Sequence, residues 1–206
     1  MQRRTYTSDE GWLLSYADLI TLLLVFFAML LGAAEISRAR MQQIAAELSG
    51  EDPPASLASI QEEIEARIEE KGLEEMIRTE LTDDGLKLSM NSGLMFDSGS
   101  AVIRTEQETL LDGMLETLVP YGGQYLFAIE GHTDSTPYGD GIRTNWELST
   151  DRANAVRSRL ETVGIEGRRI RVEGYADTVP LPAAELDGMT EDEQLARHRR
   201  VIVRVY

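Results

Sequence analysis

The sequence predicts an α/β fold, an α+β sandwich, in the C-terminal part of the chain, preceded by one membrane-spanning helix and a helical connecting region. Three observations lead to this architecture. An apolar run of 20 residues lies near the N-terminus, an acidic region with helical spacing follows, and beyond about residue 84 segments with strand-like alternation take turns with helical segments. Strands alternating with helices over about 120 residues form a compact layered domain with its own core.

The composition limits the classes of function. With 206 residues, the chain has room for one ordinary domain and accessory segments. It carries 36 acidic against 20 basic residues, a formal net charge of -16, whereas nucleic acid requires a basic surface. It contains no cysteine, which excludes disulfides, thiolate metal sites and cysteine nucleophiles.

The apolar run Trp12–Leu31 (WLLSYADLITLLLVFFAMLL) contains a single charge. At about 1.5 Å per residue it spans roughly 30 Å, the thickness of the hydrocarbon core of a bilayer. A cleaved signal peptide is the alternative, but acidic residues at positions 9, 10 and 18 do not fit such a leader. We therefore expect a short tail at 1–11 and a retained transmembrane helix at 12–34. Basic residues flank the run on both sides, so charge leaves its orientation open.

Asp18 is the single charge within this run. A carboxylate inside a transmembrane helix costs about 2.5–3.5 kcal/mol on insertion scales, and such groups usually face a protein interior or a water path. Ser15 and Thr21 share its helix face at spacings of three residues, which favours a hydrated ion site. Two other interpretations remain: a shallow position beside Trp12, or a structural ion pair with another helix.

Two helical segments follow the membrane. Met41, Ile44 and Leu48 lie on one face of a short amphipathic helix expected at 35–49, which ends before Pro53 and Pro54. Residues 50–83 are predicted to form an acidic helical linker. Its apolar stripe fits either a coiled coil between two copies of the chain or a helix lying on the following domain, and consists of Leu57, Ile60, Ile64 and Ile68.

The domain is expected at 84–206 with the order β-α-β-α-β-β. Strands are predicted at 86–90, 124–131 (the central strand), 169–175 and 199–206, with helices around 110–118 and from Thr144 onwards. Thr144 and Glu147 have the spacing of a capping box, and Gly164 is the expected C-cap of that second helix.

A candidate binding site follows the 124–131 strand. His132, Thr133 and Asp134 are expected to project from a loop, with Arg152 on the first turns of the next helix. An exposed carboxylate opposite an arginine complements a zwitterion: Asp134 would bind an ammonium group and Arg152 a carboxylate. The alternatives are an ordinary surface salt bridge and, from the enzyme class, a hydrolase acid–base pair of Asp134 with Asp140 or Glu147.

Several motifs resemble a known family. GHTD, NWELSTDRANAVRSRL and the closing HRRVIVRV resemble an OmpA-like peptidoglycan-binding domain, and MFDSGSAVI (Met95–Ile103) resembles the entry to that domain. The tryptophan of NWELS and the long loop before it resemble the MotB/PomB branch. The N-terminal run is similar to the same branch, with Asp18 at the position of the ion-carrying aspartate.

The resemblance implies a non-enzymatic stator subunit of an ion-driven rotary motor that turns flagella. It implies a homodimer surrounded by a ring of MotA/PomA-type membrane partners that contact the rotor, carrying H+ or Na+ and holding no cofactor or metal. The chain would cross the bacterial inner membrane once, with a cytoplasmic N-terminus and a periplasmic domain.

The resemblance also implies residue roles. Asp18 would carry the ion with support from Ser15 and Thr21, and the segment with Met41, Ile44 and Leu48 would be a channel plug. The residues that would bind the diaminopimelate of peptidoglycan are Thr133, Asp134, Asn145 and Arg152, with Arg199 and Arg200 supporting them.

The chain departs from the family pattern in two respects. His198 stands where an asparagine usually precedes the paired arginines, and the linker between membrane and domain is short for a flagellar stator. Related motors, namely a Zorya-type anti-phage system or a gliding motor, therefore stay open. So does a passive tether between membrane and peptidoglycan.

Overall fold

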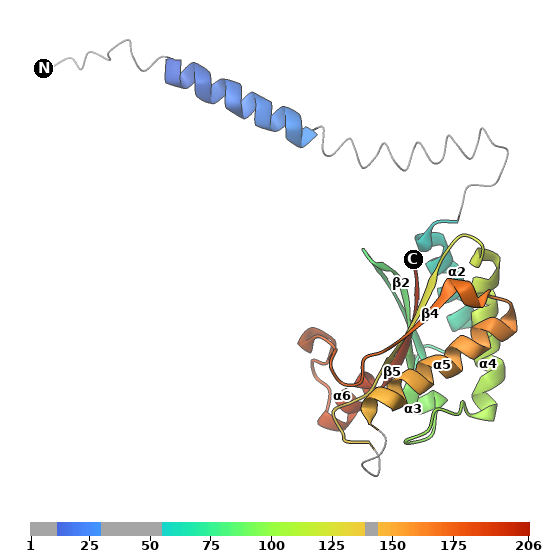
Figure 1. Ribbon diagram of the computed structural model, residues 1–206. Helices are drawn as coiled ribbons and strands as arrows, with labels where there is room; N and C mark the ends of the chain where they lie inside the picture. Colours follow the sequence, from blue (N-terminus) through green and yellow to red (C-terminus); the bar gives the residue numbers. More distant parts are fainter. Residues whose placement is uncertain (1–11, 30–54, 139–143) are drawn as a thin grey trace, which may run out of the picture. The chain divides into compact units, whose positions relative to one another are not determined.

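The computed structural model describes residues 12–29, 55–138 and 144–206, which belong to two compact units, Met1–Pro54 and Ala55–Tyr206. In the first unit a single helix, Trp12–Met29, is described, and by length and apolar composition it is able to cross a membrane (Figure 1). The expected tail at 1–11 and the plug segment at 35–49 lie outside the described residues.

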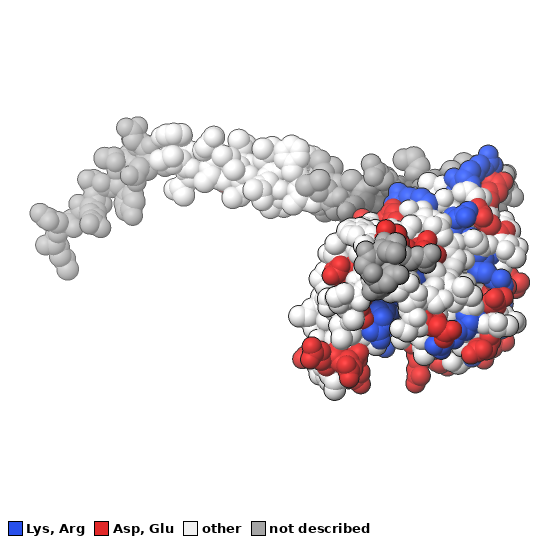
Figure 2. All heavy atoms as spheres, turned by 60° about the horizontal axis from the view of Figure 1, so that its bottom comes forward, with Lys and Arg blue, Asp and Glu red and all other residues white. Residues whose placement is uncertain are grey.

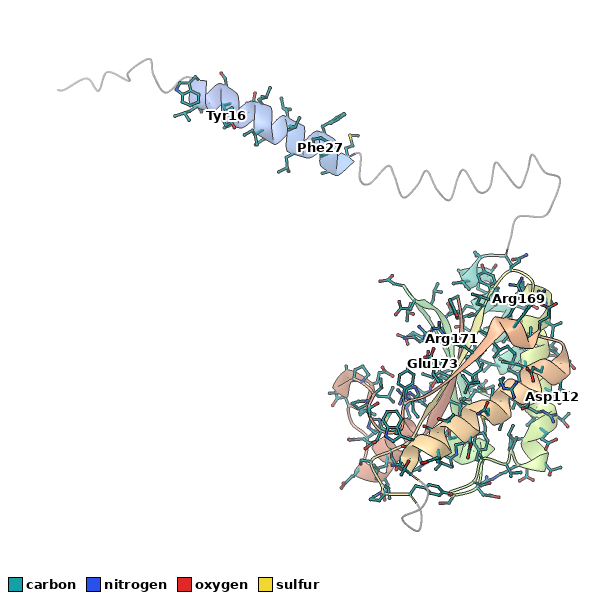
Figure 3. All side chains as sticks on the ribbon, in the orientation of Figure 1. Tyr16, Phe27, Asp112, Arg169, Arg171 and Glu173 are labelled. Carbon is teal, nitrogen blue, oxygen red and sulfur yellow. The ribbon has the colours of Figure 1, made fainter. Side chains whose placement is uncertain are left out.

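Apolar side chains cover most of the circumference of this N-terminal helix, and Ser15, Asp18 and Thr21 lie on one face of it. Its large apolar side chains are all exposed, and the face drawn in Figure 2 shows uncharged atoms along it. Side chains such as Tyr16 and Phe27 project outward from it (Figure 3). At one end the rings of Trp12 and Tyr16 lie 6.4 Å apart, an arrangement typical of the membrane–water interface. A surface of this kind is suited to lipid or to neighbouring transmembrane helices rather than to water.

The second unit contains one five-stranded sheet in the order β1-β2-β5-β3-β4 (Figure 1). Only β3 and β4 pair in parallel, and the other neighbours are antiparallel. The strands are β1 (Ile77–Thr82), β2 (Gly85–Asn91), β3 (Phe127–His132), β4 (Ile170–Gly174) and β5 (Arg200–Val205).

Three long helices cover one face of this sheet, and α6 lies on its other side (Figure 1). The α-helices of this unit are α2 (Leu57–Lys71), α3 (Ser92–Met95), α4 (Thr105–Leu115), α5 (Asn145–Val163) and α6 (Glu191–His198). Short 3-10 turns are η1 (Glu116–Tyr121), η2 (Gly167–Arg169) and η3 (Ala183–Glu185).

Strand alternation creates the core between sheet and helices. In β2, Leu86, Leu88 and Met90 point to the helices and are buried, whereas Lys87 and Ser89 point to the other face and are partly exposed. In β5 the buried apolar side chains of the core repeat with the same period of two. The predicted strands and the α/β fold class are therefore confirmed.

The ends of α5 also match the sequence prediction. Glu147 accepts a hydrogen bond from the backbone N of Thr144 at 2.7 Å, which forms the capping box. Gly164 ends the helix with φ of 117°, a left-handed conformation that favours glycine. These two caps fix the length of the helix that carries Arg152.

The 124–131 strand forms as β3, which is paired on both edges and buried along its length, as expected of a central strand. The strand in the middle of the sheet is β5, the last strand of the chain, which inserts between β2 and β3. Pairing between segments more than 60 residues apart depends on the whole tertiary arrangement, and local periodicity carries no information about it.

The domain boundary is a correction. The compact unit begins at Ala55 rather than at residue 84, so residues 55–83 fold with the domain instead of forming a linker. The stripe of α2 packs on the sheet, with Ile60 and Ile64 fully buried, and β1 pairs with β2 along its length. Of the two interpretations of this stripe, the helix lying on the domain is the one observed.

This packing leads to a stability prediction. Ile64→Ala removes a fully buried side chain from the interface between α2 and the sheet, so we expect the free energy of unfolding to fall by about 2–5 kcal/mol. The measurement is denaturant unfolding followed by circular dichroism. Glu62→Ala, on the exposed side of the same helix, is the control and should change stability by less than about 0.5 kcal/mol. Equal stability of the two variants would show that α2 is detached from the domain.

Candidate functional site

Helix α5 lies unusually close to β3 and β4, and this contact forms the base of the candidate site. A side chain at Gly131 would overlap the backbone oxygen of Ser149, and one at Gly174 would overlap the hydroxyl of Thr150. Only glycine allows this approach. The hydroxyl of Ser149 in turn accepts a hydrogen bond from the backbone N of Ala176 at 3.1 Å. The first turns of α5 are therefore held against the ends of both strands.

A hollow of about 430 Å³ opens beside this contact, and we call it the α5 hollow. Its walls are the loop after β3, the first turns of α5, the segment between α3 and α4, and the start of β5. The predicted site residues that it brings together are Thr133, Asp134, Asn145, Arg152 and Arg199.

Asp134 is buried, with an exposed fraction of 6%, which corrects the expectation of an exposed carboxylate. Its Oδ2 lies 2.5 Å from Nη1 of Arg199, and its Oδ1 accepts a hydrogen bond from the backbone N of Thr136 at 3.0 Å. The carboxylate is thus held in one orientation. Its ion-pair partner is Arg199 rather than Arg152, because β5 brings Arg199 to the end of β3.

Arg152 is buried in the wall of the hollow, with an exposed fraction of 4%. Its Nε donates to the backbone oxygen of Ser100 at 2.9 Å and its Nη2 to that of Asp97 at 3.3 Å, while the guanidinium lies over the ring of Phe96. Burial, and next the nearby Arg199, lower the pKa of Arg152. Among the described residues, no carboxylate forms an ion pair with Arg152, so the group is placed to attract an anion.

The remaining two predicted residues shape the loop. The amide of Asn145 donates to the backbone oxygens of Asp134 and Thr136, at 3.3 and 3.1 Å. The backbone N of Thr133 donates to the oxygen of Ala176 at 2.8 Å. The hydroxyl of Thr133 is buried, and none of the described residues is its hydrogen-bond partner.

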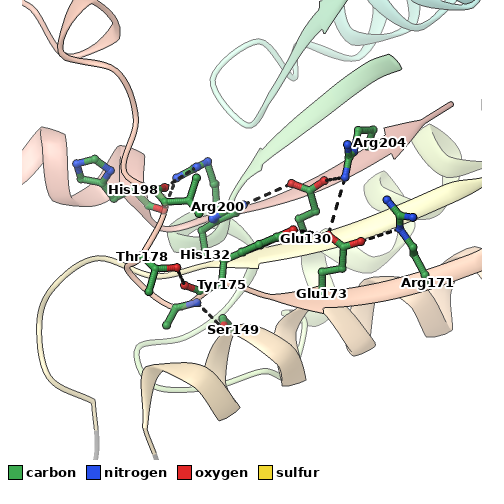
Figure 4. Close-up of polar contacts among 12 residues, drawn as sticks. Glu130, His132, Ser149, Arg171, Glu173, Tyr175, Thr178, His198, Arg200 and Arg204 are labelled. Carbon is green, nitrogen blue, oxygen red and sulfur yellow. Dashed lines mark hydrogen bonds and ion pairs between the residues drawn. The ribbon is translucent and has the colours of Figure 1, made fainter. Parts of the chain in front are cut away.

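Two predicted residues lie elsewhere. His132 is the last residue of β3 and is buried beneath the stack of its ring on Tyr175, so it does not project from a loop. Arg200 points to the sheet face opposite α5, where its guanidinium donates to the backbone oxygens of His198 and Val179 (Figure 4). Residues adjacent in a strand point to opposite faces, which separates Arg200 from Arg199.

A polar cluster surrounds His132 on that face of the sheet (Figure 4). The His132 ring lies 3.8 Å from the carboxylate of Glu130, which itself pairs with Arg204 at 2.6 Å. The hydroxyl of Tyr175 donates to Glu173 at 2.5 Å, and this hydrogen bond raises the pKa of Tyr175 to about 12. The cluster closes the sheet face behind the α5 hollow and holds the end of β3 in place.

Sequence reasoning missed the wall formed by the segment before α4. Tyr138 donates its hydroxyl to the backbone oxygen of Gly99 at 2.7 Å, and Gly99 has a φ of 67° that favours glycine. Phe96 and Asp97 line the same wall. The signal was the FDSGS run, in which small and polar residues follow an aromatic side chain and predict a tight loop.

Asp18 lies on the N-terminal helix with Ser15 and Thr21 at i-3 and i+3. The hydroxyl of Thr21 donates to the backbone oxygen of Asp18 at 2.8 Å. The Thr21 hydroxyl thus bonds to the backbone of Asp18 rather than to its carboxylate, and it adds a polar group to the same helix face. The structure thus places the carboxylate on an apolar helix of membrane-spanning length. The predicted plug residues Met41, Ile44 and Leu48 fall outside the described residues.

Two family models match the chain. The model of the OmpA family matches residues 95–193, which include most of the walls of the α5 hollow. The model described as membrane MotB of the proton-channel complex MotA/MotB matches residues 2–51, which include Asp18. The two matches lie in the same order as the two structural units.

Individual proteins are similar to this chain over most of its length. Motility protein B of Bacillus subtilis is 26% identical over 84% of this chain and 83% of its own length. The solved structure of a MotB-like protein from Desulfovibrio vulgaris covers 72% of this chain and 90% of its own, with a TM-score of 0.62 and 24% identity. The cell wall anchor of the T6SS from Pseudomonas aeruginosa covers 69% of this chain and 96% of its own, with a TM-score of 0.58 and 26% identity.

The burial of His132 leads to a pH prediction. Burial, the largest effect, lowers the pKa of His132 below its usual value of 6.5, so the folded state favours the neutral ring. The neutral ring of His132 therefore contributes fully to stability at pH values above the pKa that His132 has in the unfolded state. This contribution is lost as the pH falls from that value towards the lower pKa of the folded state. His132→Phe keeps the stack on Tyr175 but does not titrate, so we expect stability to fall less between about pH 7 and 5.

The measurement is the free energy of unfolding at several pH values in this range. The chain has only two histidines, so His198→Asn is a natural control. His198 is less buried, and burial lowers its pKa in the same direction, so its replacement should flatten the profile less. A profile that is the same in His132→Phe and in the parent chain would contradict the prediction.

Proposed function

This chain belongs to the MotB-type flagellar stator family, with a peptidoglycan-binding OmpA domain after its N-terminal segment, and from this premise we propose that it is the ion-conducting, wall-anchored subunit of a rotary motor. Asp18 carries H+ or Na+ across the membrane, and the α5 hollow holds peptidoglycan. The ion flow drives torque through a MotA-type partner. No cofactor or metal takes part.

The observation that supports ion conduction is Asp18 itself. It is the one charged residue on an otherwise apolar helix of 18 residues, and a chain that needed only an anchor would gain stability from leucine there. The energetic cost of a carboxylate inside the membrane is explained if Asp18 has to bind and release a cation. Thr21 and Ser15 supply polar groups on the same face, where a hydrated ion would pass.

The exposed circumference of the N-terminal helix supports the proposed partners. A carboxylate inside a bilayer requires shielding from lipid, which neighbouring helices provide. We place a second copy of the chain and a ring of MotA-type subunits around it. The chain crosses the inner membrane once, with the N-terminus in the cytoplasm and the OmpA domain in the periplasm, where peptidoglycan lies. Between them, the segment with Met41, Ile44 and Leu48 acts as the plug.

The charges of the α5 hollow support a zwitterionic ligand. Arg152 has no ion-pair partner within the described ranges and lies beside the pair of Asp134 with Arg199. A ligand such as diaminopimelate would place its carboxylate on the Arg152 guanidinium and its ammonium on Asp134, which then bridges ammonium and Arg199. Thr133 has a buried hydroxyl without a partner in the described part of the chain, ready to bond the same ligand.

A passive tether between membrane and wall is the second candidate. The likeness to the T6SS cell wall anchor, at 26% identity, favours it, because that protein is described as an anchor. A motor of the Zorya or gliding type would use the same parts with another rotor. The tether and the motors differ at Asp18, which only a motor requires to titrate.

The channel proposal predicts a leak that depends on Asp18. Deleting residues 41–48 removes the proposed plug, so cells that co-express the chain with its MotA-type partner should grow slowly and lose cytoplasmic pH or Na+ control. Adding Asp18→Asn, which keeps the shape but removes the charge, should restore growth. Growth rate and cytoplasmic pH, with and without external Na+, measure the effect and identify the ion.

Asp18→Glu in the same deletion is the matched control, since it keeps a titratable group and should retain part of the leak. In the undeleted chain Asp18→Asn should abolish motor function. Full cellular function of that variant would leave the tether as the explanation.

The proposal that the α5 hollow binds peptidoglycan predicts that an Asp134 variant cosediments more weakly with purified peptidoglycan sacs. Asp134→Asn removes the negative charge that orients the ligand ammonium, so we expect affinity to fall roughly tenfold. Asp151→Asn makes the same charge change on the exposed side of α5 and should bind as the parent chain does. Sacs that release soluble muropeptides during the assay would instead indicate a hydrolase.

A further inference from the structure

A second hollow lies on the sheet face opposite α5. It has a volume of about 540 Å³ and is bounded by β1, β2, β5 and the segment from Val179 to Arg197. We call it the β1–β2 hollow. It shares no lining residue with the α5 hollow and includes Arg200, which the sequence had placed in the first site.

The charges around this hollow are unusual for so acidic a chain. Its positive residues outnumber its carboxylates by one, and among the described residues none of them forms an ion pair. The cations are Arg78, Lys87, Arg197 and Arg200, and the carboxylates are Glu75, Glu80 and Glu185. Most other described arginines of the domain pair with a carboxylate, as Arg159 and Arg204 do.

Two of the arginines act on each other. Burial, and next the repulsion from Arg78, lower the pKa of Arg197, and only Glu185 opposes this effect. The Nε group of Arg197 is buried, and no described residue accepts its hydrogen bond. Arg78 and Arg197 line the same hollow, and neither forms an ion pair with a described carboxylate. Two such guanidinium groups attract an anion, because an anion relieves their repulsion and accepts their hydrogen bonds.

Arg200 has a structural role in the hollow. Its guanidinium donates to the backbone oxygens of Val179 at 3.1 Å and His198 at 3.2 Å, and thereby ties the 179–182 segment to β5 (Figure 4). That segment, Val179-Pro180-Leu181-Pro182, forms an apolar wall of the hollow, and Ile202 lies on its sheet side. The hollow therefore combines a cationic end with an aliphatic wall.

We propose that the β1–β2 hollow binds the terminal carboxylate of a peptide whose last side chain is small and aliphatic. Arg78 and Arg197 hold the carboxylate, and the Val179–Pro182 wall contacts the side chain. A surplus of one positive charge matches a carboxylate, with one negative charge, better than a phosphate with nearly two. This site goes beyond the proposed function, since it uses neither Asp18 nor the α5 hollow.

The test is binding of N-acetyl-D-alanyl-D-alanine to the full-length chain in detergent, followed by calorimetry and by backbone amide shifts. We expect binding that shifts residues of β1, β2 and the 179–197 segment. The C-terminal amide of the same peptide should bind roughly tenfold more weakly, because it lacks the charge. Comparison with the L-configured peptide identifies the source of the ligand. Tighter binding of the D form indicates peptides of the cell wall, and tighter binding of the L form indicates the C-terminus of a protein.

Arg197→Gln should weaken the carboxylate peptide roughly tenfold. Arg78 is exposed, so Arg78→Gln repeats the test with little risk to folding, and thermal unfolding verifies both variants. Arg168→Gln, an exposed arginine outside the hollow, is the matched control and should change nothing. Asp134→Asn should also leave this binding intact, so failure of the wall proposal is distinguishable from failure of this one.

Three results would overturn the proposal. One is equal binding of the peptide and its amide. Another is unchanged affinity in both Arg78→Gln and Arg197→Gln. The third is inorganic phosphate that binds to the same residues more tightly than the peptide does.

Discussion

The contact on which the site depends is the close approach of α5 to the ends of β3 and β4. Glycines at 131 and 174 leave room for the helix backbone at Ser149 and Thr150. This contact fixes the depth at which Arg152 enters the α5 hollow and the direction in which the chain leaves β3 towards Asp134. A side chain at either glycine would push the helix outward and separate the two charged groups. The binding geometry thus follows from backbone packing, and the ion pair of Asp134 with Arg199 then holds it.

The sheet presents chemically different surfaces on its two sides. On the helix side, the period of two places aliphatic side chains in one continuous core. On the other side, Glu130 of β3 contacts His132 and pairs with Arg204 of β5, while Arg200 bonds to the segment after β4 (Figure 4). Buried charged groups are costly unless they are paired, and on this side Glu130 and Arg204 form such a pair. Arg199, directly before β5, and Arg200, its first residue, consequently line separate hollows, Arg199 the α5 hollow and Arg200 the β1–β2 hollow.

The N-terminal helix differs from the domain in the exposure of its apolar side chains. In the domain, most large apolar side chains are buried by their neighbours, whereas the N-terminal helix exposes all of its large apolar side chains. Lipid and partner helices therefore have to supply the environment that the chain itself does not provide. Asp18 is compatible with that environment only where water or another protein group reaches it. The chain thus joins a segment whose function depends on partners to a domain that has its own core.

The sequence by itself determined the elements: the apolar helix with Asp18, the strands at 86–90 and 199–206, and α5 with its caps at Thr144 and Gly164. These follow from local periodicity and capping chemistry, which act over a few residues. It also selected Asp134 and Arg152, which lie in one hollow. The tertiary structure alone decided that β5 is central, that α2 and β1 belong to the domain, that Asp134 pairs with Arg199, and that Arg200 faces the opposite side. Each of these depends on which distant segments pair, and pairing is set by the burial of the whole core rather than by any local pattern.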